Sequence, residues 1–251
     1  MAIPLDNALN NDNASNALVR FGEGVAHGLT DSARPLSLEQ AMNLHQRTIV
    51  YVTRPALRLA LHPFFRMSYA GVEQVPKSGP VVLAPNHQAY ADPFWIGLPI
   101  RRPIHFMTWS RVFRVAYLRP FLRYFQCFPV DHDKPFDKSA LKVTQDLIRA
   151  GQVVMIFPEG GRTPHGDLQE FKAGAFRIAV KMGVPIVPVT LNGGFEAWSM
   201  YRKLPRPSKI AVHFHPPMRF SAGDRDLKEV AAEAARAVRE VIASKLQRPK
   251  P

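Results

Sequence analysis

The chain has a single cysteine, Cys127, so no disulfide bond can form within it. Disulfide frameworks are typical of secreted domains, and we therefore expect a reducing compartment inside the cell. No apolar run approaches the roughly 18 residues that a membrane-spanning helix needs, which argues against a transmembrane segment. Residues 1–13 contain no basic region followed by an apolar core, so we also expect no secretory signal.

Acidic residues are scarce, because 20 Asp and Glu stand against 33 Lys and Arg and leave a formal net charge of +13. Such an excess favours an anionic partner, namely nucleic acid, an anionic membrane or a phosphorylated substrate. Between Pro93 and Val130 there is no Asp or Glu at all. That stretch interleaves arginines with aromatic residues: Arg101, Arg102, Arg111, Arg114, Arg119 and Arg123 with Phe106, Trp109, Phe113, Tyr117, Phe121, Tyr124 and Phe125.

This composition is typical of two kinds of surface. Arginine beside aromatic rings can bind single-stranded nucleic acid. It equally suits a membrane interface, with rings at headgroup depth and arginines on lipid phosphates. No RNP, KH or helix-turn-helix pattern accompanies the stretch, so we expect an anionic membrane surface and no nucleic acid. The protein is then expected to be a peripheral membrane protein on the cytoplasmic face, with about half of these aromatic residues in its core.

The first 66 residues divide into two parts. Residues 1–35 are rich in Ala, Asn and Gly without an apolar period, and we expect a flexible arm. Residues 36–66 are amphipathic, with a capping-box spacing that starts at Ser37, and we expect helices that associate with the membrane. Pro55 and Pro63 argue against one long helix, so the sequence predicts two short ones.

The residues of this segment separate into two faces. The basic face holds Arg47, Arg54, Arg58 and His62. The expected apolar face holds Ile49, Val50, Tyr51, Leu57, Leu61 and Phe64. A second interpretation is a helical hairpin that only covers the core.

The remainder, residues 67–251, is expected to form one domain. Short apolar stretches alternate with helical segments, which predicts an α/β fold with a largely parallel central sheet flanked by helices. The expected strands are 80–85, 104–108, 128–131, 153–158, 184–191 and 209–217. The expected helices are 111–125, 137–150, 172–182 and 224–246, two of which end at a glycine.

The motif NHQAYAD, residues 86–92, follows the first of these strands. In an open α/β sheet, reactive side chains gather where strands end and helices begin. A neutral His87 can take a proton from a hydroxyl, while the Asp92 carboxylate fixes its tautomer and stabilises the cation that forms. Asp92 before Pro93 is also what an ordinary helix N-cap followed by proline looks like.

The motif FPEGGRT, residues 157–163, follows a second buried strand. Gly160 and Gly161 allow the backbone to approach a ligand closely, and Arg162 can bind phosphate through two hydrogen bonds. Glu159 either holds Arg162 or accepts a bond from a substrate hydroxyl. Lys172, at the start of an expected helix, offers a second anion-binding position. The alternative is a charged turn in which Glu159 and Arg162 form a surface ion pair.

NHQAYAD and FPEGGRT, about 70 residues apart, together resemble the glycerolipid acyltransferase family, whose best-known members acylate lysophosphatidic acid. The resemblance covers residues 70–217 and includes VPIVPV at 184–189. It implies direct transfer from acyl-CoA or acyl carrier protein to the hydroxyl of a lysophospholipid acceptor, most simply 1-acylglycerol-3-phosphate. It implies no covalent acyl-enzyme, no cofactor and no metal ion.

The resemblance also implies roles for particular residues. His87 would be the general base and Asp92 its orienting partner. Glu159, Gly160 and Arg162 would form part of the site for the acceptor phosphate. Three positions depart from the family pattern, because Gly161 stands where a hydroxyl residue is usual, His132 where an arginine is usual and Ser110 where a basic residue is usual. These departures leave open another acceptor, such as glycerol-3-phosphate, a lyso-ornithine lipid or another lysophospholipid.

Three further hypotheses have less support. A non-catalytic lipid-binding protein on this scaffold would have no need of His87, Asp92 and Glu159 together. A metal site at His87 and Asp92 has no third ligand at a suitable spacing. Cys127 lies in an apolar strand with nothing near it in sequence to lower its pKa, so we do not expect it to act as a nucleophile.

Overall fold

The computed structural model describes residues 42–131 and 138–247. The expected arm 1–35, the helix start at Ser37 and His132 lie outside these residues. The described strands are β1 (Ser68–Ala70), β2 (Val81–Pro85), β3 (Ile104–Trp109), β4 (Cys127–Val130), β5 (Val153–Met155), β6 (Ile186–Asn192) and β7 (Ala211–Phe214).

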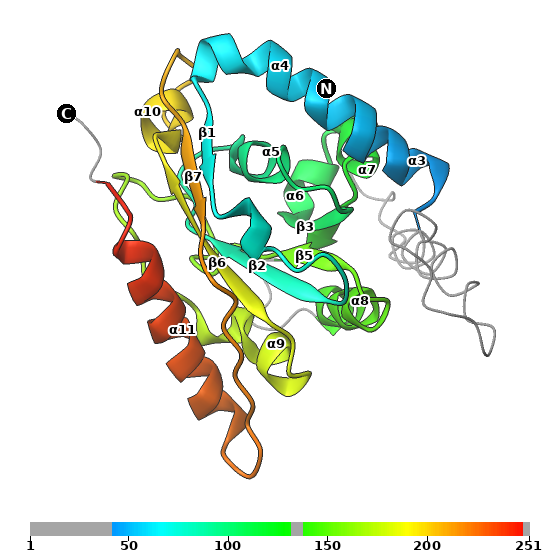
Figure 1. The fold of residues 1–251 in the computed structure, drawn as a ribbon, viewed down its shortest axis with the longest axis vertical. Coiled ribbons are helices and arrows are strands. Elements are labelled where there is room, and N and C mark those ends of the chain that lie inside the picture. Colours follow the sequence, from blue (N-terminus) through cyan, green and yellow to red (C-terminus); the bar gives the residue numbers. More distant parts are fainter. Residues whose placement is uncertain (1–41, 132–137, 248–251) are drawn as a thin grey trace, which may run out of the picture.

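These strands form one seven-stranded sheet in the order β1-β7-β6-β2-β5-β3-β4. All neighbouring pairs are parallel except β6 and β7. The predicted largely parallel α/β fold is therefore confirmed (Figure 1).

Helices cover both faces of the sheet. The described helices are α3 (Leu44–Thr48), α4 (Arg54–Phe65), α5 (Asp92–Gly97), α6 (Ser110–Phe113), α7 (Arg119–Tyr124), α8 (Lys138–Arg149), α9 (Arg177–Lys181), α10 (Gly194–Trp198) and α11 (Leu227–Ala243). A π turn lies at Ile49–Thr53, and 3-10 turns lie at Val72–Gln74, Ala116–Leu118 and Ala173–Ala175.

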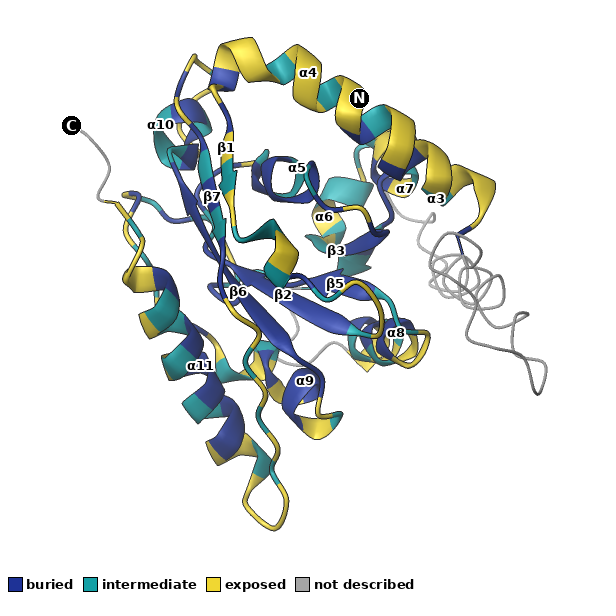
Figure 2. Cartoon of the chain, in the orientation of Figure 1, coloured by how far each residue is buried: buried dark blue, intermediate teal, exposed yellow. Residues whose placement is uncertain are grey.

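Alternating residues of the central strands enter two separate cores. Val81 and Leu83 of β2 pack with Trp95 of α5, whereas Val82 and Ala84 pack against α8, α9 and α11. Every residue of β2 and of β6 is buried, as expected for central strands with helices on both faces. Figure 2 shows these strands as the buried middle layer of the molecule.

Some predicted elements differ from the structure. The expected helix 111–125 is instead α6, a 3-10 turn and α7, because Val115 has extended backbone angles and Pro120 can occupy only the first turn of a helix. The expected helix 172–182 opens as a 3-10 turn and becomes α-helical at Arg177. The sequence analysis did not predict β1 or α10, which are too short to show a period.

Residues 44–65, which we call the N-terminal helix, form one continuous rod of α3, the π turn and α4 (Figure 1). The prediction of two separate helices is wrong. Pro55 follows the π turn, where the ladder is already rearranged and the N–H of Arg54 bonds to the carbonyl of Ile49. Pro63 lies in the last turn, where it removes a single ladder bond.

One face of the N-terminal helix belongs to the core and the other is exposed. The buried apolar residues of this helix are Ile49, Val50 and Phe65, and Leu57 and Leu61 pack against the same core as Phe65. The exposed apolar residues are Leu44, Tyr51, Val52, Leu59 and Phe64. Of the apolar face expected from the sequence, only Tyr51 and Phe64 are thus exposed. Across residues 42–131 and 138–247, no helix has the length and apolar character needed to cross a bilayer.

Two arginines that we expected on basic surfaces are buried. Arg54 donates from Nη1 to the carbonyls of Ile100 at 2.8 Å and Arg102 at 2.7 Å, which ties the N-terminal helix to the segment after α5. Arg102 itself donates to three further carbonyls, those of Pro76, Gly79 and Gly151. Burial lowers the pKa of each guanidinium to about 10. Both arginines therefore hold loops together.

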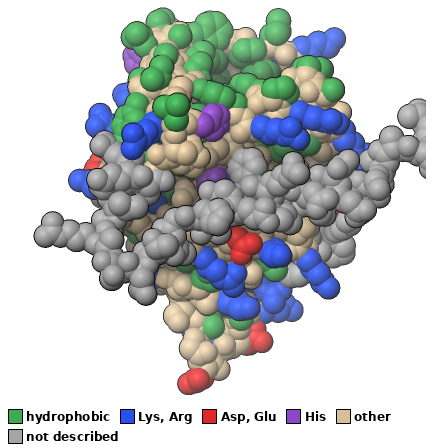
Figure 3. Space-filling model, turned by 90° about the vertical axis from the view of Figure 1, so that its right-hand side faces the viewer, with side chains coloured by type: hydrophobic (Ala, Val, Ile, Leu, Met, Phe, Trp, Pro, Cys, Tyr) green, Lys and Arg blue, Asp and Glu red, His purple; other side chains and the backbone are tan. Residues whose placement is uncertain are grey.

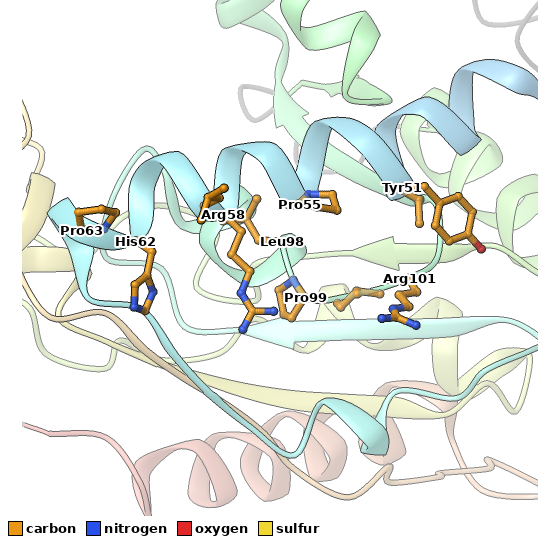
Figure 4. A pocket seen from close by; sticks show the side chains of 11 residues that line it. Tyr51, Pro55, Arg58, His62, Pro63, Leu98, Pro99 and Arg101 are labelled. Atoms are coloured by element: carbon orange, nitrogen blue, oxygen red, sulfur yellow. The ribbon is translucent and has the colours of Figure 1, made fainter.

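A groove of about 600 Å³ runs between α4 and residues 98–101. Its walls are mainly apolar, and Arg58, His62 and Arg101 contribute its basic groups. In Figure 4 these three side chains lie below α4, on the side of Pro99. The groove lies beyond the C-terminal end of α5 and is separate from the residues around His87.

Candidate active site

His87 and Asp92 meet where β2 ends and α5 begins. The Nδ1 atom of His87 lies 2.9 Å from Oδ2 of Asp92, whose side chain is fully buried while that of His87 is 18% exposed. Oδ2 also accepts hydrogen bonds from the backbone N–H groups of Gln88 at 2.5 Å and Ala89 at 2.8 Å. A carboxylate that accepts from three donors requires the proton of the neutral imidazole on Nδ1. The lone pair of His87 then lies on Nε2.

The alternative in which Asp92 is an ordinary helix cap does not match these contacts. Asp92 is the first residue of α5, and its side chain makes no capping bond to the helix. Its carboxylate instead accepts from the turn that precedes it. Oδ1 of Asp92 has no hydrogen-bond partner in the described part of the chain. The Asp92 carboxylate therefore binds His87 and the turn that follows it, and does not cap α5.

Neighbouring residues of the first motif fix this turn to the sheet. The side-chain amide of Asn86 donates to the carbonyl of Leu191 at 2.9 Å and accepts from its N–H at 2.7 Å, which joins the ends of β2 and β6. The Gln88 side chain accepts from the N–H groups of Gly194 and Phe195, at the start of α10. The His87 ring stacks on Phe157 with 3.9 Å between centroids.

The second motif is hydrogen-bonded directly to His87. Oε1 of Glu159 accepts from the backbone N–H of His87 at 2.7 Å, and the N–H of Thr163 donates to the carbonyl of His87 at 2.8 Å. Oε2 of Glu159 accepts from the N–H of Gln169 at 3.2 Å. Burial raises the pKa of Glu159 to about 7, although both amide bonds act in the opposite direction. The two motifs thus form one unit.

Glu159 and Arg162 form no ion pair, although both lie in the described part of the chain. The Arg162 guanidinium stacks instead on the ring of Tyr90, with Cζ 3.5 Å from the ring centroid. Nη1 of Arg162 is buried and finds no hydrogen-bond partner among the described residues. The alternative of a surface ion pair is therefore not what the structure contains.

Gly160 and Gly161 lie in the FPEGGRT turn, and the Lys172 side chain lies against Gly160. Gly160 has φ +73°, and a Cβ built there would lie 2.5 Å from Nζ of Lys172. Gly161 has open space around the position of a Cβ. The backbone N–H of Lys172 donates to the carbonyl of Pro158 at 2.9 Å, so its exposed side chain passes along Gly160. The Lys172 side chain therefore lies against the turn that carries Arg162.

The sequence analysis named His87, Asp92, Glu159, Gly160, Gly161, Arg162 and Lys172. The first six lie on the two joined motifs, and the Lys172 side chain lies against Gly160 of the second. His132 lies outside the described residues. The sequence analysis assigned no role to Asn86, Gln88, Tyr90, Phe157 or Thr163. All five belong to the two motifs themselves, so a closer reading of each motif position would have found them.

The sequence analysis also considered a metal site and a nucleophilic role for Cys127. Within the two described ranges, no three His, Cys, Asp or Glu side chains are arranged to hold a metal ion. Burial raises the pKa of the Cys127 thiol to about 12, so the thiolate is scarce at neutral pH.

Comparisons with known proteins identify relatives of this chain. The chain is 33% identical over 137 residues to the 1-acyl-sn-glycerol-3-phosphate acyltransferase BAT2 of Brassica napus chloroplasts, which covers 54% of this chain and 40% of the relative. It is 27% identical over 183 residues to the 1-acyl-sn-glycerol-3-phosphate acyltransferase of Pseudomonas aeruginosa, and this alignment covers 71% of this chain and 69% of the relative. The chain thus spans about half or less of the length of several relatives.

A similar fold is known from the crystal structure of the 1-acyl-sn-glycerophosphate (LPA) acyltransferase PlsC of Thermotoga maritima. The two share 22% identity and a TM-score of 0.57, over 96% of this chain and 95% of the other. The model of the Acyltransferase family matches residues 66–192, which is half of the chain and includes both motifs. The chain therefore belongs to the acyltransferase family.

Proposed function

We propose that this protein transfers a fatty acyl group from a thioester, acyl-CoA or acyl carrier protein, to the free hydroxyl of 1-acylglycerol-3-phosphate. The observation that carries the proposal is the His87–Asp92 pair, with the histidine proton on Nδ1 and the basic nitrogen Nε2 unbonded to any described residue. The family relationship supports acyl transfer as the reaction. The relatives' names support the acceptor.

The reaction follows from this geometry. Nε2 of His87 takes the proton of the acceptor hydroxyl as the hydroxyl oxygen bonds to the thioester carbonyl carbon. Asp92 stabilises the imidazolium that forms. The tetrahedral intermediate then collapses, the C–S bond breaks, and the thiolate takes the proton back from His87. The products are an ester and a free thiol, and the histidine is again neutral.

The acceptor phosphate is assigned to the cationic turn beside His87. Arg162 precedes Thr163, whose N–H donates to the His87 carbonyl, and the Lys172 side chain lies against Gly160 of the same turn, so the two residues bring two positive charges to this turn. Glu159 does not neutralise Arg162, because its oxygens accept from backbone amides. A guanidinium can bind two phosphate oxygens at once. Glu159 acts in this proposal by holding the His87 backbone in register with the turn.

The membrane surface of the proposal combines two exposed apolar regions. The first is the outer face of the N-terminal helix, and the second carries Trp109, Tyr117 and Phe121 with exposed arginines around them. The two adjoin, because Nε2 of His45 lies 3.0 Å from the Tyr124 carbonyl and the Thr53 hydroxyl bonds to the Tyr124 hydroxyl. Figure 3 shows hydrophobic side chains gathered at the end where α4 lies, with Lys and Arg beside them. Apolar side chains flanked by arginines suit the headgroup layer of an anionic membrane.

An acceptor panel tests the proposal. The purified protein is given one labelled acyl-CoA with 1-acylglycerol-3-phosphate, glycerol-3-phosphate, lysophosphatidylcholine, lyso-ornithine lipid or monoacylglycerol, and labelled products are separated. We expect the highest kcat/KM with 1-acylglycerol-3-phosphate. Arg162→Ala should raise the KM of this acceptor more than that of monoacylglycerol. A higher kcat/KM with any other acceptor would replace the proposed substrate, and no labelled ester would contradict the reaction.

A further inference from the structure

Arg162 is held by an aromatic ring and not by an acid. Its guanidinium carbon lies 3.5 Å from the centroid of the Tyr90 ring, and the nearby carboxylate of Glu159 accepts from backbone amides instead. Stacking on a ring fixes the plane of a guanidinium without using any of its N–H donors. A carboxylate partner would have occupied those donors and offset the charge. The contact with Tyr90 therefore orients Arg162 and leaves its charge without a carboxylate partner.

The same arginine has an unsatisfied donor. Nη1 of Arg162 is buried and has no partner among the described residues. A buried donor without an acceptor is unfavourable, and native proteins contain few of them. An anionic oxygen that entered beside the Tyr90 ring would relieve this cost.

Tyr90 is itself supported from a second element. Its ring lies 5.7 Å from that of Trp198, at the end of α10, and the indole Nε1 of Trp198 donates to the carbonyl of Arg202 at 3.1 Å. The start of α10 is bonded to the Gln88 side chain of the first motif. Tyr90 is 51% exposed, and its ring contacts among the described residues are those with Trp198 and Arg162. Trp198 therefore limits the positions that Tyr90 can take under Arg162.

Resting on the proposed function, we propose that Tyr90 is a positioning residue that sets Arg162 for the phosphate of a phosphomonoester acceptor, and that Trp198 supports it. The NHQAYAD motif then supplies a platform for the phosphate-binding arginine as well as the base and its carboxylate. This platform favours acceptors with a dianionic phosphomonoester over neutral acceptors of the same chain length.

The test compares Tyr90→Ala, which removes the ring, with Tyr90→Phe, which keeps it. Tyr201→Ala serves as the matched control, because this tyrosine is 68% exposed and its ring contacts neither Arg162 nor Tyr90. KM and kcat are measured with detergent-dispersed 1-acylglycerol-3-phosphate and monoacylglycerol. Binding of glycerol-3-phosphate is measured by calorimetry, which needs no turnover. Trp198→Ala is the second variant, since it removes a ring contact of Tyr90 without substituting any residue of the first motif.

Tyr90→Ala should raise KM for the phosphomonoester and the dissociation constant of glycerol-3-phosphate about fivefold, as expected for loss of one cation–π contact. Tyr90→Phe and Tyr201→Ala should resemble the wild type, and KM for monoacylglycerol should not change. Trp198→Ala should also raise KM for the phosphomonoester and the dissociation constant of glycerol-3-phosphate, by a smaller factor, and should leave KM for monoacylglycerol unchanged. The kcat values should change by less than about twofold, because the base remains in place.

Equal effects on both acceptors would overturn the inference, since they would indicate a structural role. Unchanged constants in Tyr90→Ala, or a Tyr90→Phe variant as defective as Tyr90→Ala, would overturn it too. If the wild type fails to acylate 1-acylglycerol-3-phosphate but glycerol-3-phosphate binding still depends on the ring, the proposed function fails and the inference stands. A wild type that neither acylates nor binds a phosphomonoester would refute both.

Discussion

The backbone N–H of His87 donates a 2.7 Å hydrogen bond to Oε1 of Glu159, across 72 positions of the sequence. This bond, with that from the N–H of Thr163 to the His87 carbonyl, fixes the base against the turn that carries Arg162. The spacing between His87 and the turn that carries Arg162 is thus set by hydrogen bonds of the His87 backbone, which do not involve its imidazole ring.

The first prediction concerns the pH dependence of stability at Glu159. Burial raises its pKa from the ordinary 4.5 to about 7, so between these values the folded chain keeps a proton that the unfolded chain has lost. The contribution of this proton to the free energy of unfolding is fully present below about pH 4.5 and is lost as the pH rises through about 7. Relative to Glu159→Gln, the wild type should therefore lose up to about 1.4 kcal/mol of unfolding free energy per pH unit in this window. Urea unfolding from pH 5 to pH 8 measures this, and a constant difference between the two proteins would contradict it.

Gly160 and Gly161 offer a matched pair. Gly160→Ala puts a side chain at φ +73° and forces Lys172 to move, whereas Gly161→Ala meets nothing within 4 Å. The first variant should lose about 1 kcal/mol of stability or more and bind the phosphomonoester acceptor more weakly. The second should behave as the wild type in thermal unfolding and in KM. Equal behaviour of the two variants would show that Lys172 does not need the space beside Gly160.

The sequence predicted much of this fold and site for an identifiable reason. Strands such as β2 and β6 are continuous apolar runs between turn residues, so their period and length are visible without coordinates. The outward face of the N-terminal helix was not predictable in the same way, because both of its faces are apolar. Burial of Arg54 and Arg102 depends on carbonyl groups from distant loops, which no local pattern records. The stacking of Arg162 on Tyr90 likewise joins two motifs whose register only the fold defines.

Asp92→Asn tests the orienting role of the carboxylate. Asn cannot accept from the His87 Nδ1 proton and both backbone amides as a carboxylate does, so the imidazole loses its fixed tautomer. The kcat should fall about 10²- to 10⁴-fold, with little change in the acceptor KM. Steady-state kinetics and thermal unfolding are measured on the same preparation. A large loss of stability with nearly normal kcat would assign Asp92 to folding alone.

Membrane binding is best tested by point substitutions in the N-terminal helix. Deleting residues 1–66 would remove buried Ile49, Val50 and Phe65, and so expose the core. Leu59→Asp changes a side chain that is 78% exposed, and it should weaken binding to anionic vesicles about tenfold while leaving the melting temperature unchanged.

Leu57→Asp, which alters a leucine packed against the core, is the contrasting variant and should lower the melting temperature. Vesicle sedimentation at low and high salt measures the affinity, and salt should weaken the contribution of the arginines. Unchanged sedimentation of Leu59→Asp would show that this face does not contact the bilayer.

The central claim is that His87 removes the proton of the acceptor hydroxyl. The most direct measurement is the initial rate at which purified wild type and His87→Ala convert labelled acyl-CoA and 1-acylglycerol-3-phosphate into the diacyl product, with both proteins shown to be folded. His87 is partly exposed, so its removal should cost little packing. We predict a rate at least about 10²-fold lower in the variant, with acceptor binding retained. A variant that kept more than about a tenth of the wild-type rate would contradict the assignment of His87 as the base.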